Sequence, residues 1–167
     1  MKTLVTYSSL TGNTKRVAEA ILEVMPEGTA IYSVEEAPSP ENYDLIIVGF
    51  WADRTNADKK AQKYMEQIKG KKVAIFGTLG AYPDSDHAKE TMKNARELVK
   101  ENEILGDFLC QGKVDPKLVA RFENLPADHP HGMTPERKAR LQEASKHPNE
   151  EDFIKAKKIF TEILKSI

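Results

Sequence analysis

One short segment carries residue types that suit an anion. Residues 8–14 read SSLTGNT and follow the apolar run TLVTY. The segment has hydroxyl groups, one glycine and one amide, but no charged side chain. A helix N-terminus offers unpaired N–H groups and the positive end of the helix dipole, so hydroxyl groups beside it suit a phosphate. The residues expected to form this cradle are Ser9, Leu10, Thr11, Gly12, Asn13 and Thr14.

Two common phosphate-binding patterns do not match this segment. The nucleoside-triphosphate loop has a lysine after its last glycine, where this chain has Asn13. The dinucleotide pattern needs three glycines, and the segment contains only Gly12. The segment therefore favours a single phosphate over a pyrophosphate. A turn capped by a threonine, with no ligand, is the alternative that these residues leave open.

Two later segments each place one aromatic ring after an apolar run. Trp51, the only tryptophan of the chain, follows the run at residues 44–50, and Tyr82 follows the run at residues 71–80. A flat conjugated cofactor binds well against such rings, although either ring could simply pack beneath its own loop. The binding residues expected around them are Trp51, Ala52, Asp53, Arg54, Thr55, Thr78, Leu79, Gly80 and Tyr82.

Apolar runs alternate with segments of helical periodicity along most of the chain. Strands are expected at residues 3–8, 29–34, 44–50, 71–80 and 104–112. Helices are expected at residues 13–25, 56–70, 86–101 and 150–167, the second of them capped by Asn56. This alternation predicts an α/β fold, a doubly wound parallel sheet with helices on both faces. Right-handed crossovers place the turns after parallel strands at one edge, so the three segments above are expected to meet there.

The length of 167 residues predicts a single domain over residues 1–167. Residues 113–148 do not fit a minimal five-strand alternation, and they are expected to form an inserted segment of two short helices around a loop with proline and histidine. This segment has seven Lys and Arg residues against five Asp and Glu residues. A surface elaboration of the fold and a face for docking a partner are the two interpretations that remain open.

Composition excludes several classes of function. A formal charge of −1 argues against a nucleic-acid binder, and no apolar run approaches the roughly 18 to 20 residues of a membrane span. A single cysteine, Cys110, excludes an internal disulfide and favours a reducing compartment, so a cytoplasmic location is expected. His129 and His131 lack further ligands nearby in the sequence, and no metal site is expected.

The segment Ser9-Leu10-Thr11-Gly12-Asn13-Thr14, placed after the first strand, resembles the [ST]-x-T-G-N-T phosphate loop of the flavodoxins. The alternation of strands and helices is similar to that family over nearly the whole chain, residues 113–148 excepted. The resemblance implies a five-stranded parallel sheet in the order 2-1-3-4-5. It also implies noncovalently bound flavin mononucleotide (FMN), with its phosphate on this loop and its ring between the loops that follow strands three and four.

The function implied by the resemblance is electron transfer between a reductase and an oxidoreductase partner. In that case the site residues contact the cofactor and none is a catalytic acid or base. The alternatives are a stand-alone FMN-dependent NAD(P)H oxidoreductase that acts on a small acceptor, and a binding module without flavin. The family often has a glycine that flips in the loop after strand three, whereas Asp53-Arg54-Thr55 contains none.

Overall fold

The computed structural model describes all residues, 1–167, and its strands and helices alternate along most of the chain. In chain order the elements are β1 (Thr3–Tyr7), α1 (Asn13–Leu22), β2 (Ala30–Ser33), the 3-10 helix η1 (Pro40–Asn42), β3 (Leu45–Asp53), β4 (Asn56–Ala57), α2 (Lys59–Met65), β5 (Lys72–Leu79), α3 (Asp86–Leu98), β6 (Glu103–Gln111), α4 (Pro116–Glu123), α5 (Pro135–Ala144) and α6 (Glu150–Lys165). No helix combines the length and the apolar composition that crossing a bilayer requires.

Five parallel strands form the sheet in the order β2-β1-β3-β5-β6. The predicted α/β fold and its order 2-1-3-4-5 are therefore confirmed for the parallel strands. A sixth strand differs from the prediction, because the two-residue β4 pairs with the end of β3 in the antiparallel direction. The sequence prediction of a helix over residues 56–70 is thus wrong at its start, since Asn56 lies on β4 and Asp58 caps a helix that begins at Lys59.

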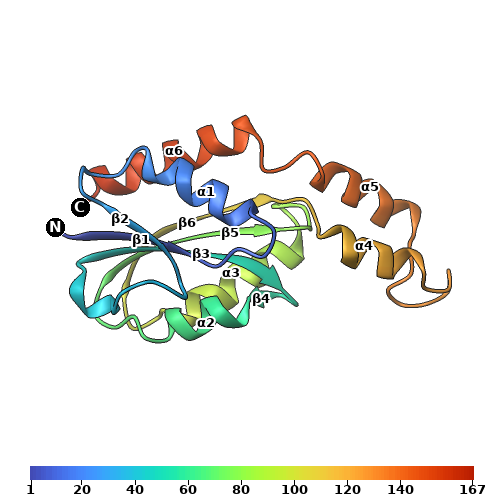
Figure 1. Ribbon diagram of the computed structural model, residues 1–167, viewed down its shortest axis with the longest axis horizontal. Coiled ribbons are helices and arrows are strands. Elements are labelled where there is room, and N and C mark those ends of the chain that lie inside the picture. The colour runs from blue at the N-terminus through green and yellow to red at the C-terminus, as the bar shows by residue number, and fades with distance from the viewer.

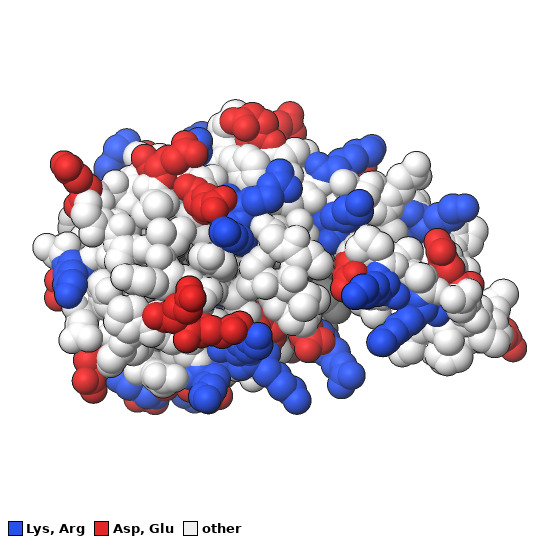
Figure 2. All heavy atoms as spheres, in the orientation of Figure 1, with Lys and Arg blue, Asp and Glu red and all other residues white.

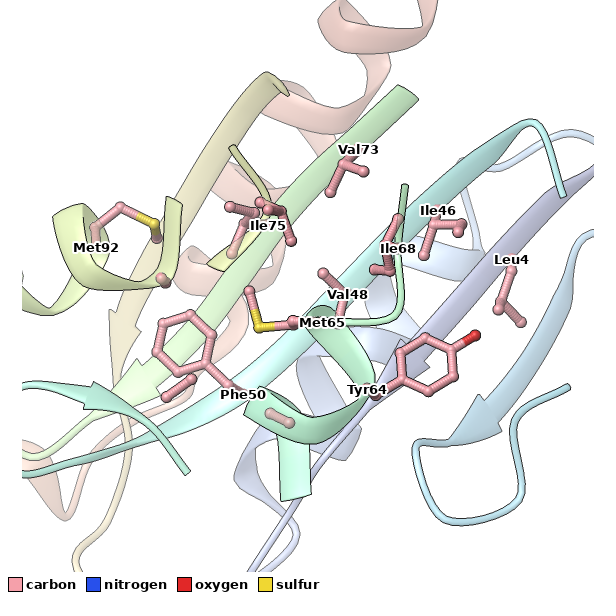
Figure 3. Packing of buried hydrophobic residues seen from close by; sticks show 14 of the residues in the cluster. Leu4, Ile46, Val48, Phe50, Tyr64, Met65, Ile68, Val73, Ile75 and Met92 are labelled. Carbon is pink, nitrogen blue, oxygen red and sulfur yellow. The ribbon is translucent and has the colours of Figure 1, made fainter. Parts of the chain in front are cut away.

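Helices cover both faces of the sheet, with α1 and α6 on one side and α2 and α3 on the other (Figure 1). The central strands β3 and β5 are buried on both faces, as their near-continuous apolar sequences require. Beneath α2 and α3, side chains from the strands meet those of Tyr64, Met65 and Met92 (Figure 3). A second cluster, which includes Val17, Phe76 and Phe160, fills the space beneath α1 and α6.

Residues 113–148, which we call the arm, lie beyond the carboxyl ends of the strands (Figure 1). The arm contains α4 and α5, and Figure 2 shows several Lys and Arg side chains over it. None of the residues of α4 is buried, in contrast to every helix that covers the sheet. The core of the sheet therefore positions the strand-end loops, while the arm adds a wall beside them.

Candidate functional site

A cleft of about 840 Å³ opens at the carboxyl ends of β1, β3 and β5. The three segments that the sequence singles out all line it, as expected for the ligand edge of a doubly wound sheet. The predicted residues that line the cleft are Ser9, Leu10, Thr11, Asn13, Thr14, Trp51, Ala52, Asp53, Arg54, Thr78, Leu79, Gly80 and Tyr82. Gly12 and Thr55 are the two predicted residues that do not line it.

The loop between β1 and α1 presents a set of backbone N–H groups without partners. The amides of Ser9, Leu10, Thr11, Asn13 and Thr14 donate to no acceptor within the chain. Gly12 lies between them with φ +96°, a conformation that side chains rarely allow, and it shapes the loop from outside the cleft. Free amides at the N-terminus of a ten-residue helix are the kind of donors that suit an anion.

Hydroxyl groups occupy three different places in this loop. The Ser9 hydroxyl accepts from the amides of Gly12 (3.1 Å) and Lys15 (3.3 Å), so it stabilises the loop from within. The buried Thr14 hydroxyl lies 2.9 Å from that of Thr78 on β5, and each can serve as donor or acceptor. The Thr11 side chain is exposed at the cleft. The loop therefore offers an anion amides and hydroxyls, with no positive side chain of its own.

Asp58 joins the ends of β1 and β3 to α2. Its carboxylate accepts from the Ser8 hydroxyl (2.5 Å), the Trp51 amide (3.2 Å) and the Ala61 amide (3.3 Å). Only 2% of the residue is exposed, and this burial raises the pKa of Asp58 although the three hydrogen bonds oppose the shift. Asp58 does not line the cleft but fixes the backbone of Trp51, which does.

The turn between β3 and β4 has an uncommon backbone. Arg54 and Thr55 adopt φ +50° and +63°, and Asp53 pairs with Asn56 across them, as in a two-residue hairpin of type I′. The Thr55 carbonyl accepts from Asn94 of α3 at 2.6 Å, so this end of the turn is tied to α3. Arg54 is exposed at the cleft edge and has no acidic group within 4 Å. The turn is thus held by its hairpin and by α3.

Two aromatic rings stand at the cleft, one on a strand and one on a loop. The prediction that Trp51 follows the third strand is wrong, because β3 extends to Asp53. Trp51 comes from the end of β3 and is partly exposed, whereas Tyr82 follows β5 and is 41% exposed. A ring that packed beneath its own loop would be buried, so the exposure of Tyr82 favours a role toward a ligand. Both side chains offer flat apolar surface to a conjugated molecule in the cleft.

Asn13 connects the loop between β1 and α1 to the arm. Its side-chain amide donates to the Lys113 carbonyl at 2.9 Å, and a Cβ on Gly112 would lie 2.8 Å from the same amide nitrogen. The Asn13 side chain is therefore committed to the base of the arm, while its backbone N–H remains free for a ligand.

The arm supplies a wall of the cleft that sequence reasoning missed. Its contributions come from the base of the arm, from α4, from α5 and from the loop between these helices, and they include Val114, Leu118, Phe122, His131, Arg137, Arg140 and Leu141. One signal could have found them, because residue 113 follows directly after the carboxyl end of a strand, at the edge where ligands bind.

Comparison with known sequences places this geometry in a family. A family model described as Flavodoxin domain matches residues 4–161. The chain is 36% identical over 164 residues to the flavodoxin-like domain-containing protein BilS of Clostridioides difficile, covering 93% of this chain and 92% of the relative.

Solved structures agree on the fold. Oxidised flavodoxin 2 from Bacillus cereus superimposes with a TM-score of 0.61 at 18% identity and complete coverage of both chains. A flavoprotein from Lactobacillus acidophilus, solved in complex with FMN, has a TM-score of 0.54 at 18% identity and covers 74% of this chain and 99% of its own. These findings confirm the predicted family, and they agree with FMN as the predicted cofactor.

Proposed function

Because this chain belongs to the flavodoxin domain family, we propose that it binds FMN and carries electrons between a reductase and an oxidoreductase partner. The observation that supports this best is the set of five free amides on the loop before α1. The same cleft is lined by two partly exposed aromatic residues, Trp51 and Tyr82. The donor set fits the cofactor, since the amides suit a phosphate and the rings suit a flat conjugated system.

Each part of the cleft has its own task in this proposal. The amides of Leu10, Thr11 and Thr14 hold the phosphate, and the Thr11 hydroxyl adds a donor. Trp51 and Tyr82 orient the ring system and exclude water from it. When bound, FMN supplies the redox chemistry, and no side chain needs to act as an acid or base.

Electron transfer also needs a surface where a partner reaches the cofactor. Leu10 (61% exposed) and Tyr82 (41% exposed) are large apolar residues at the rim of the cleft, where a protein partner would cover them. With a formal charge of −1, long-range steering of the whole chain is weak, so local contacts at this rim would select the partner. The cytoplasm remains the expected compartment, consistent with a single, buried cysteine.

An anaerobic reduction experiment tests the carrier proposal. Protein loaded with FMN is mixed first with NADPH alone, then with a trace of a flavodoxin reductase, and finally with oxidised cytochrome c as acceptor. We expect the flavin absorbance to bleach only after the reductase is added and to return as cytochrome c is reduced.

Two outcomes would contradict the carrier. Steady oxidation of NADPH by the purified protein alone would show that the protein is a stand-alone oxidoreductase and not a carrier. A protein that stays colourless after incubation with FMN would show a binding module without flavin.

A further inference from the structure

The side of the cleft beneath the arm differs chemically from the phosphate end. The loop before α1 contributes uncharged hydroxyls and amides, whereas α4 and α5 contribute apolar side chains, the cations Arg137 and Arg140 and one acid, Glu136. An adjoining hollow of about 190 Å³ continues from the cleft between the same two helices. Residues that line both spaces are Phe122, His131, Arg137, Arg140 and Leu141.

The apolar side chains on this wall cover no core. No residue of α4 is buried, and Leu118 is 39% exposed while it lines the cleft. Phe122 and Leu141 also line the cleft and are only partly buried. An amphipathic helix normally packs its apolar stripe against its own domain. Here that stripe is presented to the cleft, where a ligand would shield it from water.

Arg137 and Arg140 lie close together but have different partners. The Arg137 guanidinium donates to the carbonyls of Gly132 and Pro130, which stabilises the loop between α4 and α5. Arg140 is partly buried, donates no hydrogen bond within the chain and has no acidic group within 4 Å. A guanidinium without a partner matches a carboxylate, with which it forms two parallel hydrogen bonds.

An aromatic pair completes the wall. The rings of Phe122 and His131 stack with centroids 6.5 Å apart and planes inclined by 28°. Both residues line the cleft, so a flat ligand would meet aromatic surface here as well as at Trp51 and Tyr82.

We propose that the arm forms a second binding subsite, for a small planar organic acid. The carboxylate of the ligand binds Arg140, and its ring lies against Leu118, Phe122 and Leu141. The inference rests on the proposed function in one respect, namely that FMN takes the side of the cleft formed by the strand-end loops. A second organic molecule in the same cleft would then lie beside the cofactor.

Calorimetric titration with two matched probes tests the subsite. 2-Naphthoate and 2-naphthamide share one ring system and differ in charge, and each is titrated into FMN-loaded protein. We expect 2-naphthoate to bind roughly tenfold tighter than the amide, because it gains charge-assisted hydrogen bonds. Arg140→Gln should abolish that preference, and Phe122→Ala should weaken both probes. Lys138→Gln, on the same helix but away from the cleft, is the matched control and should change neither.

Several results would overturn the subsite. Equal affinity for the two probes, or an unchanged preference in Arg140→Gln, would contradict the proposed contact between the ligand carboxylate and Arg140. A loss of affinity for FMN but not for riboflavin in Arg140→Gln would assign this arginine to the cofactor phosphate. Sedimentation of the wild type as a dimer that Phe122→Ala dissociates would show that a second copy covers the wall. Riboflavin and FMN are also titrated into cofactor-free protein, so failure to bind flavin is read separately from failure to bind naphthoate.

Discussion

Single residues fix the positions of the segments around the cleft before any ligand binds. Asp58 lies outside the cleft, yet its carboxylate joins Ser8, Trp51 and Ala61 and so ties two strand ends to α2. The motif around Gly12 was predictable from sequence, because its residue types match a known loop in a known place. The role of Asp58 was not, since its partners Ser8 and Trp51 come together only in the folded sheet.

We predict that Asp58→Ala lowers the free energy of unfolding by about 2–3 kcal/mol, because it removes a helix cap and leaves buried donors unsatisfied. Asp58→Asn keeps an acceptor oxygen and should cost only about 1 kcal/mol. Urea denaturation of the two variants measures the difference. Equal stability of Asp58→Ala and the wild type would show that the carboxylate does not hold these segments.

The turn after β3 offers a second prediction at this scale. Thr55 adopts φ +63°, where a β-branched residue costs roughly 1 kcal/mol or more relative to glycine. Thr55→Gly should therefore raise the midpoint of thermal unfolding. The control is Thr29→Gly, because Thr29 also donates its hydroxyl to a nearby carbonyl but has no positive φ. A lower midpoint for Thr55→Gly than for the wild type would contradict a strained turn.

Elements were predictable where local pattern and burial agree. The five parallel strands and α1, α3 and α6 follow their apolar periodicity. In contrast, β4 has two residues, and its turn, Arg54-Thr55, lacks the Asn-Gly type of sequence that marks such hairpins. The path of the arm depends on contacts distant in sequence, among them the amide of Lys113, which donates to the carbonyl of His147 at 2.9 Å.

His147 also makes the junction between α5 and α6 sensitive to pH. Its ring nitrogens lie 2.6 Å from the Asp152 carboxylate and 3.3 Å from that of Glu143. Burial lowers the pKa of His147, but these two carboxylates outweigh burial and leave the pKa above its ordinary value of 6.5. A raised pKa means that protonated His147 stabilises the fold at low pH and loses this effect as pH rises through the raised value.

We therefore expect the stability advantage of the wild type over His147→Gln to be largest near pH 6 and to shrink toward pH 9. Urea denaturation at several pH values measures it. In an Asp152→Asn background, the same comparison should depend less on pH, because the main carboxylate partner is gone. An advantage that grows as pH rises would contradict the assignment.

The whole molecule consists of a buried sheet and an exposed arm. The strands that lead into the cleft pair with one another along their lengths, whereas α4 buries none of its residues. Sequence reasoning located the sheet side of the cleft, because strand ends and motifs are local features. It left the function of residues 113–148 open, because neither composition nor charge indicates which way an amphipathic hairpin faces. In the two proposals above, the sheet side of the cleft takes the cofactor and the arm takes a small organic acid.

The most direct test of the account compares the dissociation constants of FMN and riboflavin for the cofactor-free wild type. The two molecules differ by the phosphate alone, so their ratio reports what the loop before α1 contributes. Two or more charge-assisted hydrogen bonds from its free amides predict FMN to bind roughly 100-fold tighter or more. Equal dissociation constants would contradict the claim that this loop holds the phosphate of a flavin.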